Sequence, residues 1–104
     1  MKQPQFAVYV LYSLKDFQFY IGFTTDFNRR MGEHKEGHSK STASRRPFIV
    51  VLVEYYHSKK DAMRRELYFK TTAGRRILRL MLSESLSEIN DELVTKEFYY
   101  LVKK

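Results

Sequence analysis

Three apolar stretches set the pattern of this chain, and each predicts a β-strand. Residues 6–12 and 48–56 carry almost unbroken runs of β-branched, aromatic and aliphatic side chains, which indicates strands buried on both faces. Residues 17–22 form a third, shorter run. Residues 13–16, which join the run 6–12 to the run 17–22, are typical of a tight connection. We therefore expect these two strands to form an antiparallel hairpin.

This hairpin would place two tyrosines side by side. A connection at 13–16 pairs the strands so that Tyr9 lies directly opposite Tyr20. On the face of these tyrosines, Gly22 would leave open backbone beside a hydroxyl group, as a ligand site needs. The alternative is that Tyr9 and Tyr20 are a packed aromatic pair. The opposite face would carry the core residues Phe17, Phe19 and Ile21.

A helix is expected over about 26–36, with Asp26 among the residues that cap its start. At 100° per residue, Arg30 and His34 lie one turn apart, on or beside the face that carries Phe27. An arginine at the edge of an inward face needs an anion, and phosphate is a natural one. The alternatives are a carboxylate partner for Arg30, such as Glu33 or Glu54, and a hydrogen-bonded core-edge role for His34.

A second helix should run to about Lys70, with Ser58 and Asp61 resembling a capping pair at its start. Glu66 falls inside the apolar stripe of this helix, between Ala62 and Phe69. An unpaired carboxylate is costly there, so Glu66 must be paired, protonated or bound to a metal. An internal salt bridge to Arg30, Arg65 or a lysine is the structural alternative.

Two further segments concentrate positive charge. The polar loop 37–47 and a helix expected over about 73–82 supply candidate contacts to a phosphate backbone. The usual explanation for such segments, solvated surface, is the alternative for both. The candidate DNA-binding residues are Lys40, Arg45, Arg46, Arg75, Arg76 and Arg79.

Composition and charge define the class of protein. The 104 residues suit one domain, expected at 1–82, with residues 83–104 as an extension that packs on it or mediates contacts. In this extension we expect a short helix near 86–94 and an apolar end at 98–102 that docks on the domain or makes a dimer contact. The net charge of +7 favours a polyanionic partner, nucleic acid before an anionic membrane.

Several classes are excluded. The chain has no cysteine, so it forms neither a disulfide framework nor a thiolate metal site. It contains no apolar run of about 18 residues, so no spanning helix and no membrane partner are expected. The first residues lack the apolar core of a signal peptide, and we expect a cytoplasmic protein that is a monomer or a weak homodimer.

The order and spacing of five residues resemble the GIY-YIG endonuclease domain, as found in its small single-domain members and in the N-terminal domain of the excision-repair nuclease C subunit. The resemblance covers about residues 5–82, and the stretches 45–48 and 62–66 are also typical of it. The first signature tripeptide, residues 7–9, lacks its glycine, and Phe23 stands where some active members carry a lysine. The five residues are Tyr9, Tyr20, Arg30, His34 and Glu66.

The resemblance implies an α+β fold, a small three-stranded antiparallel sheet flanked by helices, and metal-dependent hydrolysis of DNA phosphodiesters, with a link to DNA repair or recombination. Glu66 would hold Mg²⁺ or Mn²⁺, Arg30 would hold the scissile phosphate, and Tyr9 or Tyr20 would take a proton from the attacking water. His34 would orient a tyrosine or relay a proton. The alternatives are a catalytically idle DNA-binding module, or a protein-interaction domain; a protein partner would supply specificity.

Overall fold

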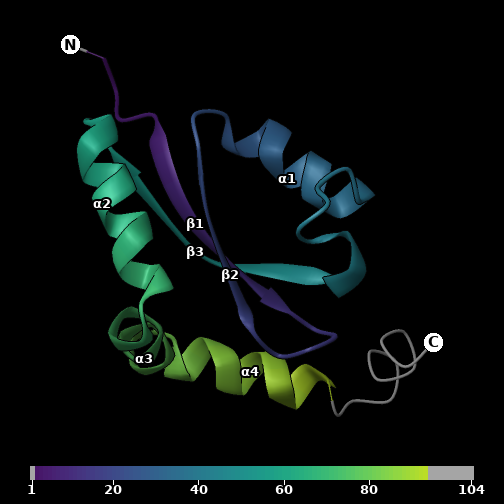
Figure 1. Cartoon of the computed structure of the whole chain (residues 1–104). Coiled ribbons are helices and arrows are strands. Elements are labelled where there is room, and N and C mark those ends of the chain that lie inside the picture. The colour runs from purple at the N-terminus through teal and green to yellow at the C-terminus, as the bar shows by residue number, and fades with distance from the viewer. Residues whose placement is uncertain (1, 94–104) are drawn as a thin grey trace.

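The computed structural model describes residues 2–93 and confirms the expected α+β architecture, a three-stranded antiparallel sheet flanked by helices (Figure 1). The strand order is β2-β1-β3, so β1 lies in the middle and the other two strands are edges. Helices α2, α3 and α4 lie on one side of the sheet and α1 lies on the other (Figure 1). The elements are β1 (Phe6–Ser13), β2 (Phe19–Thr24), α1 (Phe27–Glu36), a 3₁₀ turn (Ala43–Arg45), β3 (Phe48–Tyr56), α2 (Lys59–Lys70), α3 (Thr72–Met81) and α4 (Ser83–Leu93).

Strand β1 is the buried centre of the fold, as its unbroken apolar run predicts. Every residue from Ala7 to Ser13 is buried. Alternate side chains point to opposite faces of a strand, and here the two faces have different functions. Val8, Val10 and Tyr12 join the hydrophobic core beneath α2, α3 and α4. Tyr9 turns to the opposite face and contacts α1.

The expected hairpin register is wrong by two residues. Tyr9 pairs with Gly22, and Tyr20 pairs with Leu11. The connection still has four residues but lies one position later, because Ser13 remains in the strand and its backbone N–H donates to the Gln18 carbonyl at 3.0 Å. The Ser13 hydroxyl fixes this turn by accepting from the N–H groups of Lys15 and Asp16. Since a shift of two residues preserves the faces, both tyrosines remain on the same side.

The new register removes Phe17 from the core, where the sequence had placed it. Phe17 closes the turn with a positive φ of 58° and is 45% exposed. Phe19 and Ile21 do occupy the core, at 3% exposure each. The pattern alone did not show where the turn ends, because an aromatic residue at a positive φ is rare.

Strand β3 is less buried than its apolar run suggested. It is an edge strand, and all its residues are at least partly exposed. The pairing with β1 shifts between Val10 and Leu11, where Leu52 and then Val50 are the partners. The prediction of a strand buried on both faces is therefore correct for β1 and wrong for β3.

The helices begin and end close to their predicted limits. The Asp26 side chain caps α1 by accepting from the Arg29 N–H, as expected, whereas Ser58 makes no side-chain cap for α2. Helix α4 starts at Ser83, three residues earlier than predicted, and buries Leu86 and Leu93 in the core. The predicted apolar end at 98–102 lies outside the described residues. Within residues 2–93, no helix is long and apolar enough to cross a membrane.

Candidate active site

Tyr9 is the centre of a hydrogen-bonded cluster between β1 and α1. Its side chain is 1% exposed. Its hydroxyl lies 2.8 Å from His34 Nε2 and accepts a hydrogen bond of 3.3 Å from Arg30 Nε. The Tyr20 ring lies 6.4 Å from the Tyr9 ring and 5.4 Å from the His34 ring. Four of the five residues predicted to form the site are therefore in one cluster.

Gly22 is required by the position of Tyr9. A Cβ atom on Gly22 would overlap Cζ and Oη of the Tyr9 ring, so only glycine leaves room for it. From the sequence, Gly22 was expected to leave backbone open for a ligand. Instead, the Tyr9 ring fills that space and is held in place by it.

Arg30 lies beside Tyr9, on the inward edge of α1 where the helical periodicity predicted it. Its side chain is 28% exposed, whereas the Arg29 side chain is 66% exposed. Nη1 forms an ion pair of 3.1 Å with Glu33, one turn along α1, and Nη2 donates to Ser39 Oγ at 3.4 Å. Burial lowers the pKa of Arg30, but its hydrogen bonds to Tyr9 and Glu33 outweigh this and raise the pKa above its usual value. The guanidinium is therefore a permanent cation at the edge of the site.

His34 is buried and connects Tyr9 to the loop that follows α1. Its side chain is 3% exposed, and Nδ1 lies 2.8 Å from Oγ1 of Thr42, which is fully buried. When Nδ1 carries the proton, it donates to Thr42 while the Tyr9 hydroxyl donates to Nε2. This tautomer satisfies every group, because Tyr9 still accepts from Arg30.

Three hydroxyl residues of this loop belong to the site but were not predicted from the sequence. Ser39 and Thr42 are buried, and the Ser41 hydroxyl donates to Tyr20 Oη at 3.3 Å. We had treated loop 37–47 only as a basic surface segment. The signal present in the sequence was the density of small hydroxyl side chains, which hydrogen-bond neighbouring polar groups when a loop is packed rather than solvated.

Burial controls the protonation of Tyr9. It raises the pKa of Tyr9 to about 12, and the hydrogen bond from Arg30 offsets this only in part. The negative charge of Glu66 adds to the increase in the Tyr9 pKa. Tyr9 is therefore a neutral phenol at neutral pH in the protein alone.

Burial also keeps His34 neutral. It lowers the pKa of His34 to about 4, and the positive charge of Arg30 contributes in the same direction. The unfolded chain, with a histidine pKa near 6.5, binds this proton first as the pH falls. Protonation of His34 therefore favours unfolding between about pH 6.5 and pH 4.

We expect this buried histidine to give the protein a pH-dependent stability in that window. The free energy of unfolding should fall by up to about 3 kcal/mol between pH 7 and pH 4 through His34. Urea unfolding at several pH values measures the effect. His34→Gln should flatten the slope, while His38→Gln, at a histidine whose side chain is 65% exposed, should leave it unchanged. An unaltered slope in His34→Gln would contradict the account.

Glu66 is the fifth predicted residue, and it lies on α2. Its side chain is 17% exposed and forms an ion pair of 3.2 Å with Lys70, one turn later. Of the partners considered from the sequence, a lysine is the one that the structure shows; Arg65 pairs with Glu54 instead. Helix α2 packs on β1 and β2 from the side of the sheet opposite α1, and from there the negative charge of Glu66 makes the smallest of the contributions that act on the Tyr9 pKa.

The donor set around Glu66 limits which metal would fit. Residues 2–93 contain no group of three or more His, Cys, Asp or Glu side chains able to hold an ion. A tetrahedral zinc site needs three or four protein ligands, and this arrangement does not supply them. Mg²⁺ keeps most of its water and binds through one or two carboxylates together with substrate phosphates. A single carboxylate such as Glu66 fits that chemistry.

Two of the predicted DNA-binding arginines have structural partners. Arg45 forms a bidentate ion pair with Asp16, in which Nε lies 2.6 Å from Oδ2 and Nη2 donates to Oδ1. The hydrogen bonds from Arg45 lower the pKa of Asp16. Arg46 Nε and Nη1 donate to the carbonyls of Ala43 and Lys35, so its guanidinium ties the 3₁₀ turn to the end of α1. Lys40 is exposed in the same loop.

Arginines from two distant segments meet where β2 begins. Arg45 Nη2 and Arg75 Nη1 both donate to the carbonyl of Phe19, at 3.4 and 3.5 Å. The Arg79 guanidinium lies over the Phe19 ring, 5.0 Å from its centre. Arg76 is exposed on the same helix, α3. This arginine cluster (Arg45, Arg75 and Arg79) gathers around Phe19, whose ring lies on the core face of β2, whereas Tyr20 points to the opposite face.

The fold is that of a nuclease-type domain, and comparison with known proteins gives the family. The family model described as "GIY-YIG catalytic domain" matches residues 5–78, so the chain belongs to the GIY-YIG family. It is 37% identical over 75 residues to a UPF0213 protein of Staphylococcus haemolyticus, covering 71% of this chain and 90% of that one. It is 35% identical to a UPF0213 protein of Clostridium perfringens, covering 82% and 91%.

A solved structure agrees with this assignment. The solution NMR structure of a UPF0213 protein from Bacillus halodurans is 33% identical in sequence and superimposes with a TM-score of 0.50. The match covers 88% of this chain and 97% of that one.

Proposed function

We propose that this protein is a metal-dependent endonuclease that hydrolyses DNA phosphodiester bonds. The observation that carries the proposal is the Tyr9–Arg30–His34 cluster, in which a buried phenol, a fixed cation and a neutral imidazole share hydrogen bonds. A purely structural role would not need an arginine held at the edge of a buried tyrosine with part of its surface open to solvent. The GIY-YIG assignment supports the same reaction class.

Arg30 would bind the scissile phosphate. Its guanidinium is held by Tyr9, Glu33 and Ser39, so it loses little freedom when it meets an anion. A fixed donor aimed at charge that develops in the transition state stabilises that state more than a mobile one. Arg30 would therefore offset the negative charge that grows on the phosphate oxygens.

Tyr9 would handle the proton of the attacking water, with His34 as its positioning residue. The neutral His34 ring accepts from the Tyr9 hydroxyl and is itself fixed by Thr42. Mg²⁺ or Mn²⁺ held by Glu66 would supply positive charge that lowers the pKa of nearby hydroxyl groups. Tyr20, whose ring is partly exposed, stays the alternative proton acceptor.

Incubation with supercoiled plasmid and with a branched DNA tests the reaction class. The wild-type protein should nick DNA in Mg²⁺ or Mn²⁺ and not in chelator. Faster cleavage of the branched DNA would support a structure-specific role in repair or recombination. Salt-sensitive DNA binding without cleavage in any metal would contradict the proposal and leave a DNA-binding module of the same fold.

The arginine cluster beside the start of β2 is a candidate DNA contact outside the tyrosine site. Arg75→Gln and Arg79→Gln should each weaken DNA binding and reduce the dependence of log K on log[salt] by about one unit, because each removes one phosphate contact. Fluorescence anisotropy at several salt concentrations measures both quantities. The matched control is Arg64→Gln, whose side chain is 75% exposed on α2 and pairs with Asp61. Equal losses in all three variants would mean a general charge effect rather than a path beside β2.

A further inference from the structure

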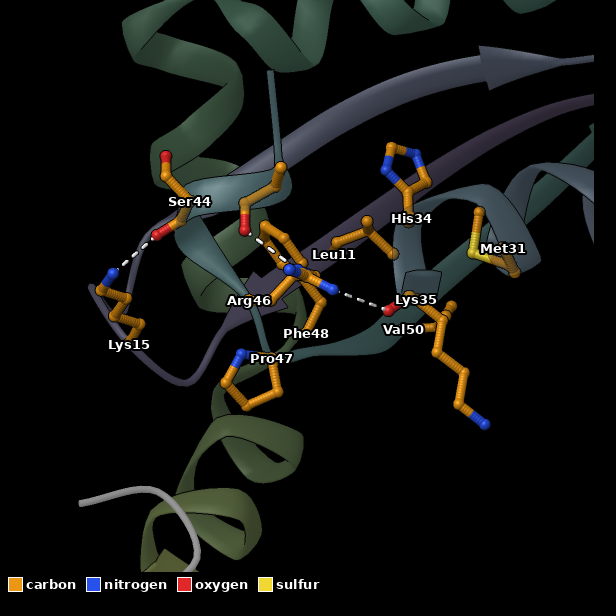
Figure 2. Close-up of a pocket in the computed structure, with 11 residues that line it drawn as sticks. Leu11, Lys15, Met31, His34, Lys35, Ser44, Arg46, Pro47, Phe48 and Val50 are labelled. Carbon is orange, nitrogen blue, oxygen red and sulfur yellow. Dashed lines mark hydrogen bonds between the residues drawn. The ribbon is translucent and has the colours of Figure 1, made fainter. Parts of the chain in front are cut away.

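A cavity of about 760 Å³ lies between α1, the 3₁₀ turn and the strands β1 and β3 (Figure 2). Its volume is in the range of small-molecule sites, about 300–1,000 Å³. It is distinct from the tyrosine cluster: of the residues discussed as catalytic, only His34 contributes to its lining.

The cavity wall is largely apolar. Leu11 comes from β1, Phe48 and Val50 come from β3, and Met31 comes from α1. Val50 is 41% exposed, which is unusual for an aliphatic residue on a strand and marks apolar surface without a protein partner in the described part of the chain. Figure 2 shows Leu11 and Phe48 grouped beside Arg46 at the middle of the cavity. Such a wall suits a flat, weakly polar ring.

Three cations from three segments accompany this apolar wall, and no carboxylate does. They are Lys15 in the hairpin turn, Lys35 at the end of α1, and Arg46 after the 3₁₀ turn. None of the three forms an ion pair with any residue from 2 to 93, although other surface cations here, such as Arg29 and Arg64, do. Arg46 uses Nε and Nη1 on backbone carbonyls and has Nη2 left for another acceptor.

We propose that this cavity is a nucleotide-binding site, in which a base lies against Phe48 and Val50 and a phosphate is met by Lys35 and Arg46. A nucleotide combines an apolar ring with an anionic phosphate. The ring fits the apolar wall, and the phosphate fits the cations at its edge, which form no ion pair with residues 2–93. The nucleotide is either a free mononucleotide or the phosphorylated end of a DNA strand. The proposal does not rest on DNA cleavage, since binding can be measured without it.

Occupation of the cavity would act on the active site through shared residues. His34 lines the cavity and holds the Tyr9 hydroxyl. The loop that carries Ser39, Ser41 and Thr42 toward the tyrosines continues directly into Ala43, Ser44 and Arg46 of the cavity. A bound nucleotide would therefore stabilise the loop that orders Arg30 and His34.

Titration of the full chain with deoxyadenosine monophosphate, followed by amide NMR shifts, tests the proposal. The largest shifts should fall on Lys35, Phe48 and Val50. Deoxyadenosine without phosphate, and inorganic phosphate alone, should each bind at least about tenfold more weakly, because each satisfies only half of the site. A 5′-phosphorylated hairpin DNA that competes, when its unphosphorylated form does not, would identify a strand end rather than a free nucleotide as the ligand.

Two variants and two matched controls complete the test. Lys35→Gln should weaken binding about fivefold and Val50→Glu at least about tenfold, since the first removes a cation and the second adds an anion. Lys60→Gln and Leu67→Glu make the same changes on exposed sites of α2, outside the cavity, and should alter affinity less than about twofold. Shifts centred on Tyr20 and Arg30, equal affinity in all four variants, or no binding at millimolar nucleotide would each overturn the proposal.

Discussion

Replacing Arg30 with glutamine should lower DNA cleavage by about 10²–10³-fold while the protein stays folded. The expectation follows from the three hydrogen bonds that fix the guanidinium beside Tyr9. Arg30→Lys should recover only part of the rate, because lysine keeps the charge and loses the planar fork that binds phosphate oxygens in pairs. Single-turnover cleavage rates with saturating protein measure the effect separately from DNA affinity.

The control for Arg30 is its neighbour in sequence. Arg29→Gln removes the same charge from the same helix, but the Arg29 side chain is 66% exposed and pairs with Asp26. It should cleave at close to the wild-type rate. If both variants lost activity equally, the effect would be one of net charge on DNA binding, and the assignment of Arg30 to the phosphate would be wrong.

Gly22→Ala should have the second large effect, on stability and activity together. The added methyl group would overlap the Tyr9 ring, and because β1 is buried the ring has little room to move. Overpacking of this kind costs about 1–3 kcal/mol of unfolding free energy. A displaced Tyr9 hydroxyl would also lose its contacts with His34 and Arg30, so cleavage should fall by about tenfold or more.

A second glycine provides a control, because its replacement by alanine should change the unfolding free energy in the opposite direction. Gly32 lies in α1 and has nothing within 4 Å of an added Cβ. Gly32→Ala should raise the unfolding free energy by about 0.5–1 kcal/mol, because alanine favours the helix. Urea unfolding of the two variants measures both changes. A Gly22→Ala protein as stable and active as the wild type would contradict the position of Tyr9.

Local periodicity was enough to bring most of the site together. Arg30 and His34 lie where the wheel of a helix over 26–36 puts them, since both the cap at Asp26 and the inward residue Phe27 are local signals. The tyrosine pair remained on one face although the register was wrong, because the error was an even number of residues.

Contacts that join distant segments were beyond the sequence pattern. The buried hydroxyl of Thr42 acquires its partner only when loop 37–47 folds back over α1. The meeting of Arg45 with Arg75 at the Phe19 carbonyl likewise depends on how α3 packs against the hairpin. In both cases the sequence showed a residue able to form a hydrogen bond but did not show its partner. Partners so far apart in the sequence are determined by tertiary packing rather than by spacing along the chain.

The effect of burial on protonation was also hidden from the sequence. The resemblance assigned to Tyr9 or Tyr20 the role of taking a proton from the attacking water, which needs the phenolate form. In the structure of the protein alone, burial instead raises the pKa of Tyr9 to about 12. In the proposed function, a metal ion held by Glu66 would supply the missing positive charge, which makes this carboxylate the critical group of the proposal.

The comparison of Glu66→Gln with Lys70→Gln in the plasmid assay tests that claim most directly. The two residues form one ion pair of 3.2 Å, so each variant breaks the same contact, and only the first removes the carboxylate. We predict that Glu66→Gln abolishes nicking in Mg²⁺ and Mn²⁺, whereas Lys70→Gln nicks DNA at close to the wild-type rate. Metal-dependent nicking that persists in Glu66→Gln at the wild-type rate would contradict the proposed metal carboxylate and the site built around it.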